Sequence, residues 1–446
     1  MCQLASERYL RYWNIFQPQA RLASAFHQSL HGSTIACSGM RKHLLLFAAT
    51  TGYQIREFAA AAKRIGADVT LATDRCHIMD DPWGDHAVPV KFDRVAESLA
   101  VLRESNLKVD GVTAVGDRPA VLAAAAAEMF GVPFHPHAAA LACHDKHLAR
   151  SLFRAAGMRV PAFFRATFAE DAEQVAARAM YPCVLKPLGL SASRGVIRAN
   201  NPDEFVAAFR RIARMGETEL QVEAYIPGRE FAVEGLVTGG ELQVIAVFDK
   251  PDLLEGPYFE ETIYVTPSRE TEDVQRALVV TTAEAVRVLG LTHGPVHAEL
   301  RYNDEGAWIL EVHTRPIGGL CARAVRLADG IPLEEMILVH ALGGDVSMAR
   351  PDAEASGVMM IPIPKGGIYQ SVEGVEHARS VCGIDDVVIT AAEGQHLIPL
   401  PEGATYLGFI FARGETAKQV EAALRQSHAE LRFHIATTLE TFSPSS

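Results

Sequence analysis

Residues 295–315, PVHAELRYNDEGAWILEVHTR, restrict the fold of this 446-residue chain more than any other segment. Two runs of alternating apolar and polar residues flank residues 303–306, which have the composition of a hairpin turn. If the hairpin is symmetric about Glu305, then Glu299 and Glu311 lie directly opposite each other on neighbouring strands. The sequence therefore predicts a β-hairpin that places two carboxylates face to face.

The two faces of this hairpin are predicted to differ in character. His297 and His313 pair on the face that carries the two acids, because side chains alternate between the faces of a strand. The opposite face is predicted to be apolar, and it carries Val296, Ala298, Leu300, Trp308, Leu310 and Val312.

Two carboxylates that face each other repel, so the fold must neutralise or tolerate their charge. At about 5 Å and an effective dielectric constant of about 20, two such charges repel each other by about 3 kcal/mol. A cation between them, or a proton on one of them, removes this repulsion. Paired carboxylates with Arg315 nearby suit Mg²⁺ and phosphate. The alternative is a solvated hairpin face with ordinary surface glutamates.

The composition excludes several classes of protein. Hydrophobic residues make up 49% and charged residues 22% of the chain, which is typical of globular proteins, and the length predicts about two to four domains. The net charge of −12 argues against general nucleic-acid or anionic-membrane binding. Seven scattered cysteines without a CxxC pair indicate free thiols in a cytoplasmic protein. No apolar run reaches the roughly 18 residues of a membrane span.

The first 39 residues lack both a secretory signal pattern and clear periodicity. Met40 leads directly into an abrupt apolar run that starts at His43. We therefore expect residues 1–39 to be a loosely attached extension, or Met40 to be the natural start of the protein.

The next hundred residues, 40–140, are predicted to form a parallel α/β domain, because strands and helices alternate along the chain. Residues 50–53, TTGY, follow the first strand and do not match GxGxxG, so a dinucleotide-binding fingerprint is absent. The strands are expected at 43–49, 68–73 and 112–115, and the helices at 54–65 and 120–130.

The middle of the chain carries several segments that are weak signals alone and fairly specific in their order. They are Lys146 before a helix, Lys186 at the end of a strand, the Gly/Ser loop 187–195, Glu223 before Tyr225-Ile226-Pro227-Gly228-Arg229-Glu230, and the hairpin with Glu299 and Glu311-Val312-His313-Thr314-Arg315. In this order and spacing, the chain resembles the ATP-grasp ligases over residues 141–343. The resemblance implies an ATP-grasp fold of mixed α/β and α+β class, with the N-terminal α/β domain before it and a small C-terminal α+β domain after it. The implied boundaries are 141–344, with a lid at about 150–225, and 345–446.

The resemblance implies a set of ATP-binding residues. A flexible Gly/Ser loop can lay backbone N–H groups on phosphate oxygens, and lysines supply point charges for the same oxygens. Glu223 matches the acid beside the adenine amino group, with the backbone of Ala224 and Tyr225 facing the base. Glu230 matches the residue that accepts the ribose hydroxyls. The phosphate contacts are expected from Lys146, Lys186, Gly189, Ser191, Ser193 and Gly195.

The resemblance also assigns the hairpin. Glu299 and Glu311 match the acids that bridge Mg²⁺, for which Mn²⁺ is an alternative. The family commonly has an Asn where this chain has His313, and imidazole is a poorer Mg²⁺ ligand than an oxygen donor. Either His313 lies behind the ligands, or a second metal is held differently, and His313 is kept with Glu299 and Glu311 as a candidate metal residue. Arg315 matches the arginine that neutralises the transferring phosphoryl group.

Within the family, the chain is most similar to the L-amino acid ligases, which make dipeptides. In a similar stretch of these ligases an acid holds the substrate amino group, and here Glu261 fits that acid while Tyr264 stands where a His is usual. Gly318 and Gly319 follow Arg315 and would let a substrate carboxylate approach the backbone. The C-terminal segment with Gly366-Gly367 and Gly374-Val375-Glu376 resembles the small domain that ends these ligases.

The implied activity is ATP-dependent joining of a small carboxylate to an amine, through an acyl phosphate, with ADP as a product. The implied partners are these small molecules, with a homodimer possible and with no nucleic acid or membrane. Two alternatives stay open. One is a biotin-carboxylase-like or purine-pathway enzyme that uses carboxyphosphate or formyl phosphate. The other is a nucleotide-binding module without turnover.

Overall fold

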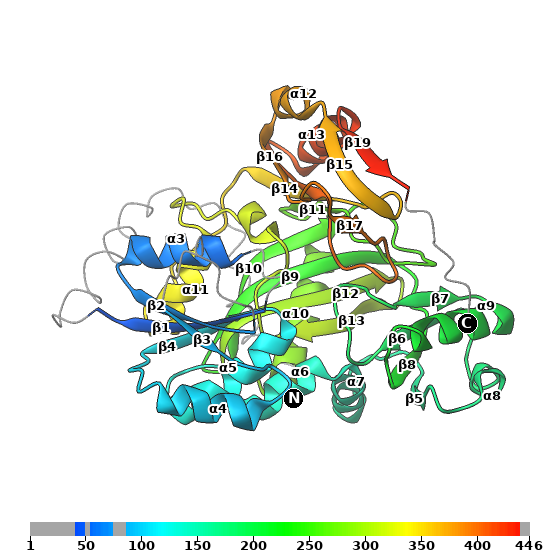
Figure 1. The fold of residues 1–446 in the computed structure, drawn as a ribbon, viewed down its shortest axis with the longest axis horizontal. Coiled ribbons are helices and arrows are strands. Elements are labelled where there is room, and N and C mark those ends of the chain that lie inside the picture. Colours follow the sequence, from blue (N-terminus) through cyan, green and yellow to red (C-terminus); the bar gives the residue numbers. More distant parts are fainter. Residues whose placement is uncertain (1–40, 50–53, 75–85, 438–446) are drawn as a thin grey trace, which may run out of the picture. The chain divides into compact units, whose positions relative to one another are not determined.

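The computed structural model describes residues 41–49, 54–74 and 86–437. The predicted extension 1–39 and the turn 50–53 lie outside these residues. The chain divides into two compact units, each built from several segments (Figure 1). The first unit comprises residues up to Val160 together with Phe231–Asp249 and Thr266–Ala353, and the second comprises Pro161–Glu230, Lys250–Val265 and the segment from Glu354. The four-part division expected from the sequence stays a prediction.

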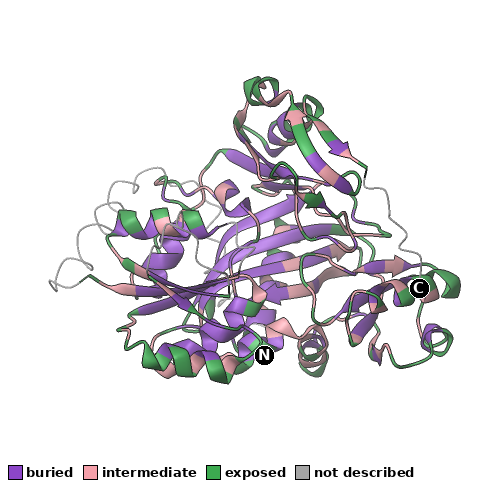
Figure 2. Cartoon of the chain, in the orientation of Figure 1, coloured by how far each residue is buried: buried purple, intermediate pink, exposed green. Residues whose placement is uncertain are grey.

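The first unit begins with the predicted parallel sheet. Its strands are β1 (His43–Ala48), β2 (Asp68–Thr73), β3 (Ala87–Pro89) and β4 (Gly111–Val115), in the order β3-β2-β1-β4 and all parallel. Described helices follow β1, β3 and β4 in the chain, as the predicted alternation of strands and helices requires. The helices are α3 (Ile55–Ile65), α4 (Val95–Glu104) and α5 (Asp117–Phe130). In Figure 2 the largely buried strands of this sheet lie above α4, whose outer face is exposed.

The rest of the first unit surrounds a second apolar core. The helices are α6 (His137–His144), α7 (Lys146–Ala155), α10 (Glu272–Leu289) and α11 (Leu333–Ala341), with a 3₁₀ helix η2 (Cys321–Ala324). The strands β9 (Arg229–Thr238), β10 (Glu241–Lys250), β12 (His293–Asn303) and β13 (Gly306–His313) lie in the order β13-β12-β9-β10. The apolar faces of these strands and of α7 and α10 share one core. Among the described residues, none of the helices combines the length and the apolar character that crossing a bilayer requires.

The hairpin β12–β13 confirms the predicted register at its far end and corrects it near the turn. Glu299 pairs with Glu311 and His297 with His313, as expected. The turn itself is tighter, because Asn303 pairs with Gly306 and only two residues lie between them. A bulge after Glu299 then adds Leu310 as an extra residue and restores the predicted register.

An arginine from another element stabilises this bulge. Arg150 on α7 is 2% exposed and donates hydrogen bonds to the carbonyls of Ile309 at 2.6 Å and Leu310 at 3.0 Å. These carbonyls lie where the ladder is interrupted, and buried carbonyls need donors. Arg150 therefore links the bulge to α7. Without the bulge, the register set at the turn would place Leu310 opposite Glu299.

The bulge also overturns one predicted apolar face. Ile309 pairs with Leu300, and both are fully buried, whereas Leu310 and Trp308 are only partly buried. Trp308 pairs with Arg301, donates its indole N–H to Asn303 Oδ1 at 3.1 Å and lies 5.3 Å from the Arg159 guanidinium. The prediction that Trp308 and Leu310 belong to the hairpin core was wrong, because the extra residue shifts the alternation by one position.

The second unit contains a four-stranded antiparallel sheet. Its strands β5 (Phe163–Thr167), β6 (Cys183–Pro187), β7 (Ile197–Ala199) and β8 (Glu219–Ala224) lie in the order β5-β8-β6-β7. Helices α8 (Ala172–Ala176) and α9 (Pro202–Ala213) cover one face and share its apolar core.

The C-terminal part of the second unit is α+β, as predicted, although several of its strands were missed. The strands β11 (Ile263–Thr266), β14 (Ala355–Ile361), β18 (Gly408–Gly414) and β16 (Ile384–Ile389) are consecutive in one sheet. A smaller sheet has the order β17-β15-β19. Its strands are β17 (His396–Leu397), β15 (Gly367–Glu373) and β19 (Arg432–Ala436), and the helices are α12 (Val375–Ser380) and α13 (Ala417–Ala429).

Candidate active site

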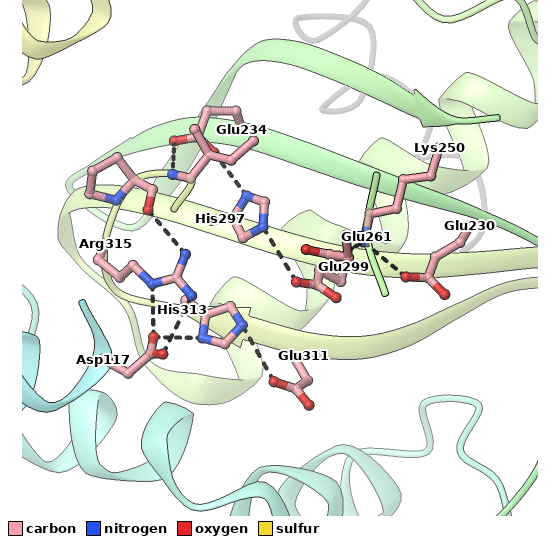
Figure 3. Close-up of polar contacts among 12 residues, drawn as sticks. Asp117, Glu230, Glu234, Lys250, Glu261, His297, Glu299, Glu311, His313 and Arg315 are labelled. Atoms are coloured by element: carbon pink, nitrogen blue, oxygen red, sulfur yellow. Dashed lines mark hydrogen bonds and ion pairs between the residues drawn. The ribbon is translucent and has the colours of Figure 1, made fainter. Parts of the chain in front are cut away.

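The face of the hairpin that carries the two acids lies within a set of charged side chains from four parts of the first unit (Figure 3). We call this set the hairpin cluster. The end of β4 and the start of α5 supply one acid, β9 supplies another, and the hairpin and the residues after it supply the rest. The hairpin cluster consists of Asp117, Glu234, His297, Glu299, Glu311, His313 and Arg315.

Arg315 is held by Asp117, the first residue of α5. Its Nε donates to Asp117 Oδ1 at 2.8 Å, and Nη1 donates to the Pro316 carbonyl at 3.1 Å. His313 Nδ1 lies 2.8 Å from the same Asp117 oxygen. Burial alone raises the pKa of Asp117, but Arg315 and His313 outweigh burial and hold this pKa well below its usual value. Asp117 is therefore a carboxylate that fixes the arginine and the orientation of the imidazole.

His297 is held in a similar way by a buried acid on β9. Its Nδ1 lies 3.0 Å from Glu234 Oε2, and both side chains are almost completely buried. Burial raises the pKa of Glu234 and lowers the pKa of His297, while the hydrogen bond between them acts against both shifts. The other Glu234 oxygen accepts a hydrogen bond from the Ile317 N–H at 3.1 Å. Glu234 thus ties the hairpin to the chain just before Gly318.

Each histidine turns its second ring nitrogen toward one of the opposed acids. His297 Nε2 lies 3.5 Å from Glu299, and His313 Nε2 lies 3.5 Å from Glu311. The two rings are stacked with centroids 5.9 Å apart. An acid from another element, a histidine and a partly exposed glutamate therefore form the same series twice, once for each strand of the hairpin.

Glu299 and Glu311 are the residues of this cluster best placed to hold a cation. Their side chains are 22% and 24% exposed, and their backbones are direct cross-strand partners. Carboxylate oxygens are the donors that Mg²⁺ prefers, and a carboxylate that fixes a histidine is typical of the shell behind metal ligands. The donor chemistry fits a hard divalent cation, with His313 oriented by Asp117.

The remaining predicted residues of the first unit lie at the start of α7 and just after the hairpin. Lys146 is the first residue of α7, whose N-terminus is capped by Asp145. Gly318 has open space where a Cβ would point, and Gly319 has a φ of +63°. Gln54 donates to the Ile317 carbonyl at 2.6 Å, so both peptide groups of Ile317 are anchored. The two glycines therefore follow a fixed point of the backbone.

In the second unit, the predicted acids are paired with lysines. We call Lys186, Glu223, Glu230, Lys250 and Glu261 the lysine cluster. Lys250 Nζ lies 2.8 Å from Glu230 and also donates to Glu261, and its side chain is only 3% exposed. The ring of the buried Tyr264 has its centroid 5.1 Å from the same ammonium. Glu230, Glu261 and Tyr264, predicted separately, are thus gathered around one lysine.

Lys186 and Glu223 form the second pair of the lysine cluster. Lys186 Nζ lies 2.7 Å from Glu223 Oε2, and Gln221 donates to the other oxygen at 2.8 Å. The N–H groups of Ala224 and Tyr225 donate to the carbonyls of residues 162 and 182. The predicted adenine-facing backbone therefore already takes part in hydrogen bonds of the β5–β8–β6 region.

The Gly/Ser loop 187–195 is anchored at both ends. The Gly189 N–H donates to Glu217 at 3.1 Å, and the Gly195 N–H donates to the Pro401 carbonyl at 2.8 Å. Between them, Ala192 and Ser193 adopt left-handed backbone conformations, with φ near +56° and +55°. The partly to fully exposed middle of the loop, which includes Ser191, is the part that projects from its two anchors.

Comparison with known proteins places this geometry in a family. Residues 179–324 match the sequence model of the ATP-grasp domain, and residues 359–436 match that of L-amino acid ligase C-terminal domain 2. The crystal structure of an L-amino acid ligase from Bacillus licheniformis matches 90% of this chain and 100% of its own chain, with a TM-score of 0.76 and 25% identity. The chain therefore contains an ATP-grasp domain and has the ATP-grasp fold.

Curated relatives match this ATP-grasp chain over shorter stretches. The alanine–anticapsin ligase of Bacillus subtilis is 24% identical over 254 residues, which cover 52% of this chain and 53% of the relative. The uncharacterized protein y4rH of Sinorhizobium fredii is 23% identical over 302 residues, which cover 66% of this chain and 62% of the relative. The chain thus spans less than two thirds of the length of either relative.

Three residues of this ATP-grasp chain were missed as site residues. Asp117 directly follows a parallel strand at a helix N-terminus, a place where α/β sheets bind ligands. Glu234 interrupts the apolar strand REFAVEGLVT on the same face as Glu230. Lys250 ends the apolar run of β10. A charged residue within a strand that is otherwise apolar was the available signal for the last two.

Proposed function

We propose that this protein is an ATP-dependent carboxylate–amine ligase that forms an amide or peptide bond through an acyl phosphate. One observation carries the proposal. Glu299 and Glu311 face each other across the hairpin, and Arg315, which follows on the same segment, donates a hydrogen bond to Asp117. Two carboxylates and a rigid guanidinium are the groups needed to hold a cation and the charged oxygens of a phosphoryl group.

The family relations support the amine-ligating version of this chemistry. The C-terminal match is to a domain of L-amino acid ligases, and the relatives include an alanine–anticapsin ligase and a crystallised L-amino acid ligase. These names favour an amino acid or a similar small carboxylate as the first substrate. They do not favour the bicarbonate or formate chemistry of the first alternative.

The roles proposed for nucleotide binding follow the two clusters. Glu230 is proposed to accept the ribose hydroxyls, and Glu223, with the backbone of Ala224 and Tyr225, is proposed to meet the adenine. Binding at Glu223 would compete with its ion pair to Lys186, which would release that ammonium toward phosphate oxygens. The other proposed phosphate contacts come from Lys146, Gly189, Ser191 and Ser193, whereas the Gly195 N–H already donates to the Pro401 carbonyl.

Glu299 and Glu311 are the proposed ligands of Mg²⁺, with Mn²⁺ as the alternative. When bound, the cation would neutralise negative charge on the phosphate oxygens of ATP. We propose that His313 orients Glu311 and does not coordinate the metal, because imidazole is a poorer Mg²⁺ ligand than an oxygen donor and its Nε2 lies 3.5 Å from Glu311.

The proposed reaction has two steps. A substrate carboxylate oxygen attacks the γ-phosphorus of ATP, the bond from the γ-phosphorus to the bridging oxygen breaks, and ADP leaves. The amine of the second substrate then attacks the acyl carbon, loses a proton and expels phosphate. Arg315 is proposed to stabilise the charge on the transferring phosphoryl oxygens in both steps.

The proposed substrate contacts come from both clusters. Gly318 and Gly319 would let a carboxylate approach the backbone that Glu234 and Gln54 anchor. Glu261 and Tyr264 are proposed to meet the amino group of the first substrate, and Lys250 already shares the Glu261 carboxylate. The substrate ammonium would therefore bind beside a lysine, which favours a substrate with compensating negative charge. Homodimer formation and a cytoplasmic location stay predictions.

The test is a screen for phosphate release with MgATP and all pairs of the twenty standard amino acids, extended to β-alanine and other small amines. We expect release that requires both a carboxylate and an amine, with the amide product identified by mass spectrometry. Release with bicarbonate or formate and no amino acid would replace this function with the carboxyphosphate or formyl-phosphate alternative. Binding of ATP without release under any condition would favour the module without turnover.

A further inference from the structure

The C-terminal part of the second unit reaches the Gly/Ser loop through a short turn, residues 399–403. The Pro401 carbonyl accepts the Gly195 N–H at 2.8 Å, and the Glu402 carbonyl accepts Arg194 Nε at 3.0 Å. The end of the loop is thus held by two carbonyls that are 200 residues away along the sequence.

A side-chain ion pair fixes this turn on helix α9. Arg211 donates to both oxygens of Glu402, from Nε at 2.6 Å and from Nη2 at 3.0 Å, and its Nη1 donates to the Tyr258 hydroxyl. Such a two-pronged contact restrains direction as well as distance. The hydrogen bonds from Arg211 lower the pKa of Glu402, so the pair is charged at neutral pH.

The two turns joined by the Gly195–Pro401 hydrogen bond have backbones with little room to change. A Cβ on Gly403 would lie 1.7 Å from the Ile398 carbonyl oxygen, and the Gly403 N–H donates to the Pro399 carbonyl at 2.9 Å. A Cβ on Gly195 would lie 2.6 Å from Pro187 Cγ, and Gly195 has a φ of +66°. Two glycine-dependent turns therefore meet at one backbone hydrogen bond.

We propose that Glu402 and Arg211 are positioning residues for the Gly/Ser loop, and that they set the direction in which residues 191–193 present their N–H groups to nucleotide phosphates. The Gly195 N–H serves as the anchor and not as a phosphate donor, because Pro401 accepts it. The inference rests on the proposed function only for the identity of the ligand. Through this contact the C-terminal domain sets the geometry of the phosphate-binding loop.

The chain offers a matched control on the same helix. Arg210, the neighbour of Arg211, forms an ion pair with Glu173 at 2.7 Å. Both side chains of this pair are largely exposed. Arg210→Ala removes the same charge from the same helix without touching the turn. Arg211→Ala and Glu402→Gln remove the proposed contact from either side, and Glu402→Gln keeps both the size of the side chain and the Pro401 carbonyl.

The first measurement is amide hydrogen exchange of residues 188–196 in the protein without nucleotide. We expect the Gly195 N–H to exchange about three- to fivefold faster in Arg211→Ala and in Glu402→Gln. The effect is modest because a partly exposed ion pair contributes little free energy. Arg210→Ala should leave the rate unchanged. Unchanged exchange in both test variants, or equal acceleration in the control, overturns the proposal.

The second measurement separates phosphate contacts from base contacts. The test variants should weaken the binding of ATP by about the same three- to fivefold factor and leave the binding of adenosine unchanged. The exchanged pair Arg211→Glu with Glu402→Arg should recover part of the loss. Equal weakening for adenosine and ATP would contradict a role at the phosphates. If the parent protein binds no ATP, the proposed function fails, while the exchange rates still decide whether the turn holds the loop.

Discussion

The hairpin cluster and the lysine cluster neutralise their acids in different ways. In the lysine cluster, Lys250 contacts both Glu230 and Glu261 with its ammonium. On the hairpin, Glu299 and Glu311 face each other, and each lies 3.5 Å from an imidazole that another acid holds. A lysine supplies a permanent charge, whereas an imidazole supplies one only when protonated. We therefore expect the Lys250 contacts to stabilise their acids without an added cation, and a bound cation to stabilise the opposed acids of the hairpin.

The largest expected effect is on activity. Glu311→Ala should lower phosphate release by about 10²-fold or more, which is the usual loss when one electrostatic stabiliser is removed from a reacting site. The measurement is the rate of phosphate release at saturating MgATP. Glu305→Ala, at the exposed turn of the same hairpin, is the control and should behave like the parent. Equal rates for the two variants would remove the hairpin from the catalytic site.

The next effect concerns stability and separates the two clusters. Lys250→Met should lower the free energy of unfolding by about 3 kcal/mol, because it leaves two neighbouring carboxylates without their shared ammonium. Urea unfolding measures this loss, which should be the same with and without Mg²⁺. Lys365→Met, an exposed lysine of the same unit, is the control and should cost little. Recovery of stability on adding Mg²⁺ would mean that the two clusters do not differ in the way described.

A smaller effect is expected where Arg315 is anchored. Asp117→Asn should cost about 2 kcal/mol in unfolding free energy, since it removes the charge between Arg315 and His313 but keeps a side chain that can accept a hydrogen bond. The variant should also release phosphate more slowly than the parent. Asp93→Asn, at an exposed position of the same unit, is the control. Parent-like stability and rate together would show that Asp117 does not position the arginine.

The smallest effect comes from neutral histidines away from the hairpin. Burial lowers the pKa of His340 to about 3, and its ring is stacked on His293 at 3.9 Å. Because the unfolded chain binds a proton near pH 6.5 and the folded chain does not, stability is complete above that pH and is lost as the pH falls toward 3. Between pH 7.5 and 5.5 this one group should cost about 1.4 kcal/mol.

His340→Gln tests this effect, because a glutamine amide can replace the contact of His340 Nε2 with the Thr238 hydroxyl at 2.8 Å. The variant should lose about 1.4 kcal/mol less than the parent between the two pH values. Urea unfolding at pH 7.5 and pH 5.5 provides the comparison. The same pH dependence in both proteins would exclude His340 as its source.

The sequence predicted what depends on local alternation and missed what depends on distant partners. Period-two alternation was enough to pair Glu299 with Glu311 and His297 with His313. The bulge that makes this register possible is contacted by Arg150, which comes from a helix about 160 residues earlier, so no local pattern predicts it. The misplacement of Trp308 followed from the same missing residue.

The candidate site was predicted as separate residues, and the structure supplies their anchors. Glu230 and Glu261 were assigned different roles, yet Lys250 joins them. Asp117 and Glu234 come from elements far from the hairpin in sequence, and only the tertiary fold brings them to His313 and His297. Motif spacing predicts the residues that contact a ligand. It does not as readily predict the residues that hold those side chains in place.

The most direct test of the central claim is whether the opposed glutamates hold a divalent cation together with nucleotide. Electron paramagnetic resonance of Mn²⁺ in the presence of ADP reports immobilised metal directly and does not depend on turnover. The parent should immobilise Mn²⁺ when ADP is added, and the double variant Glu299→Gln with Glu311→Gln should leave the metal in solution. Immobilisation of Mn²⁺ by the double variant, as strong as that by the parent, would contradict the account.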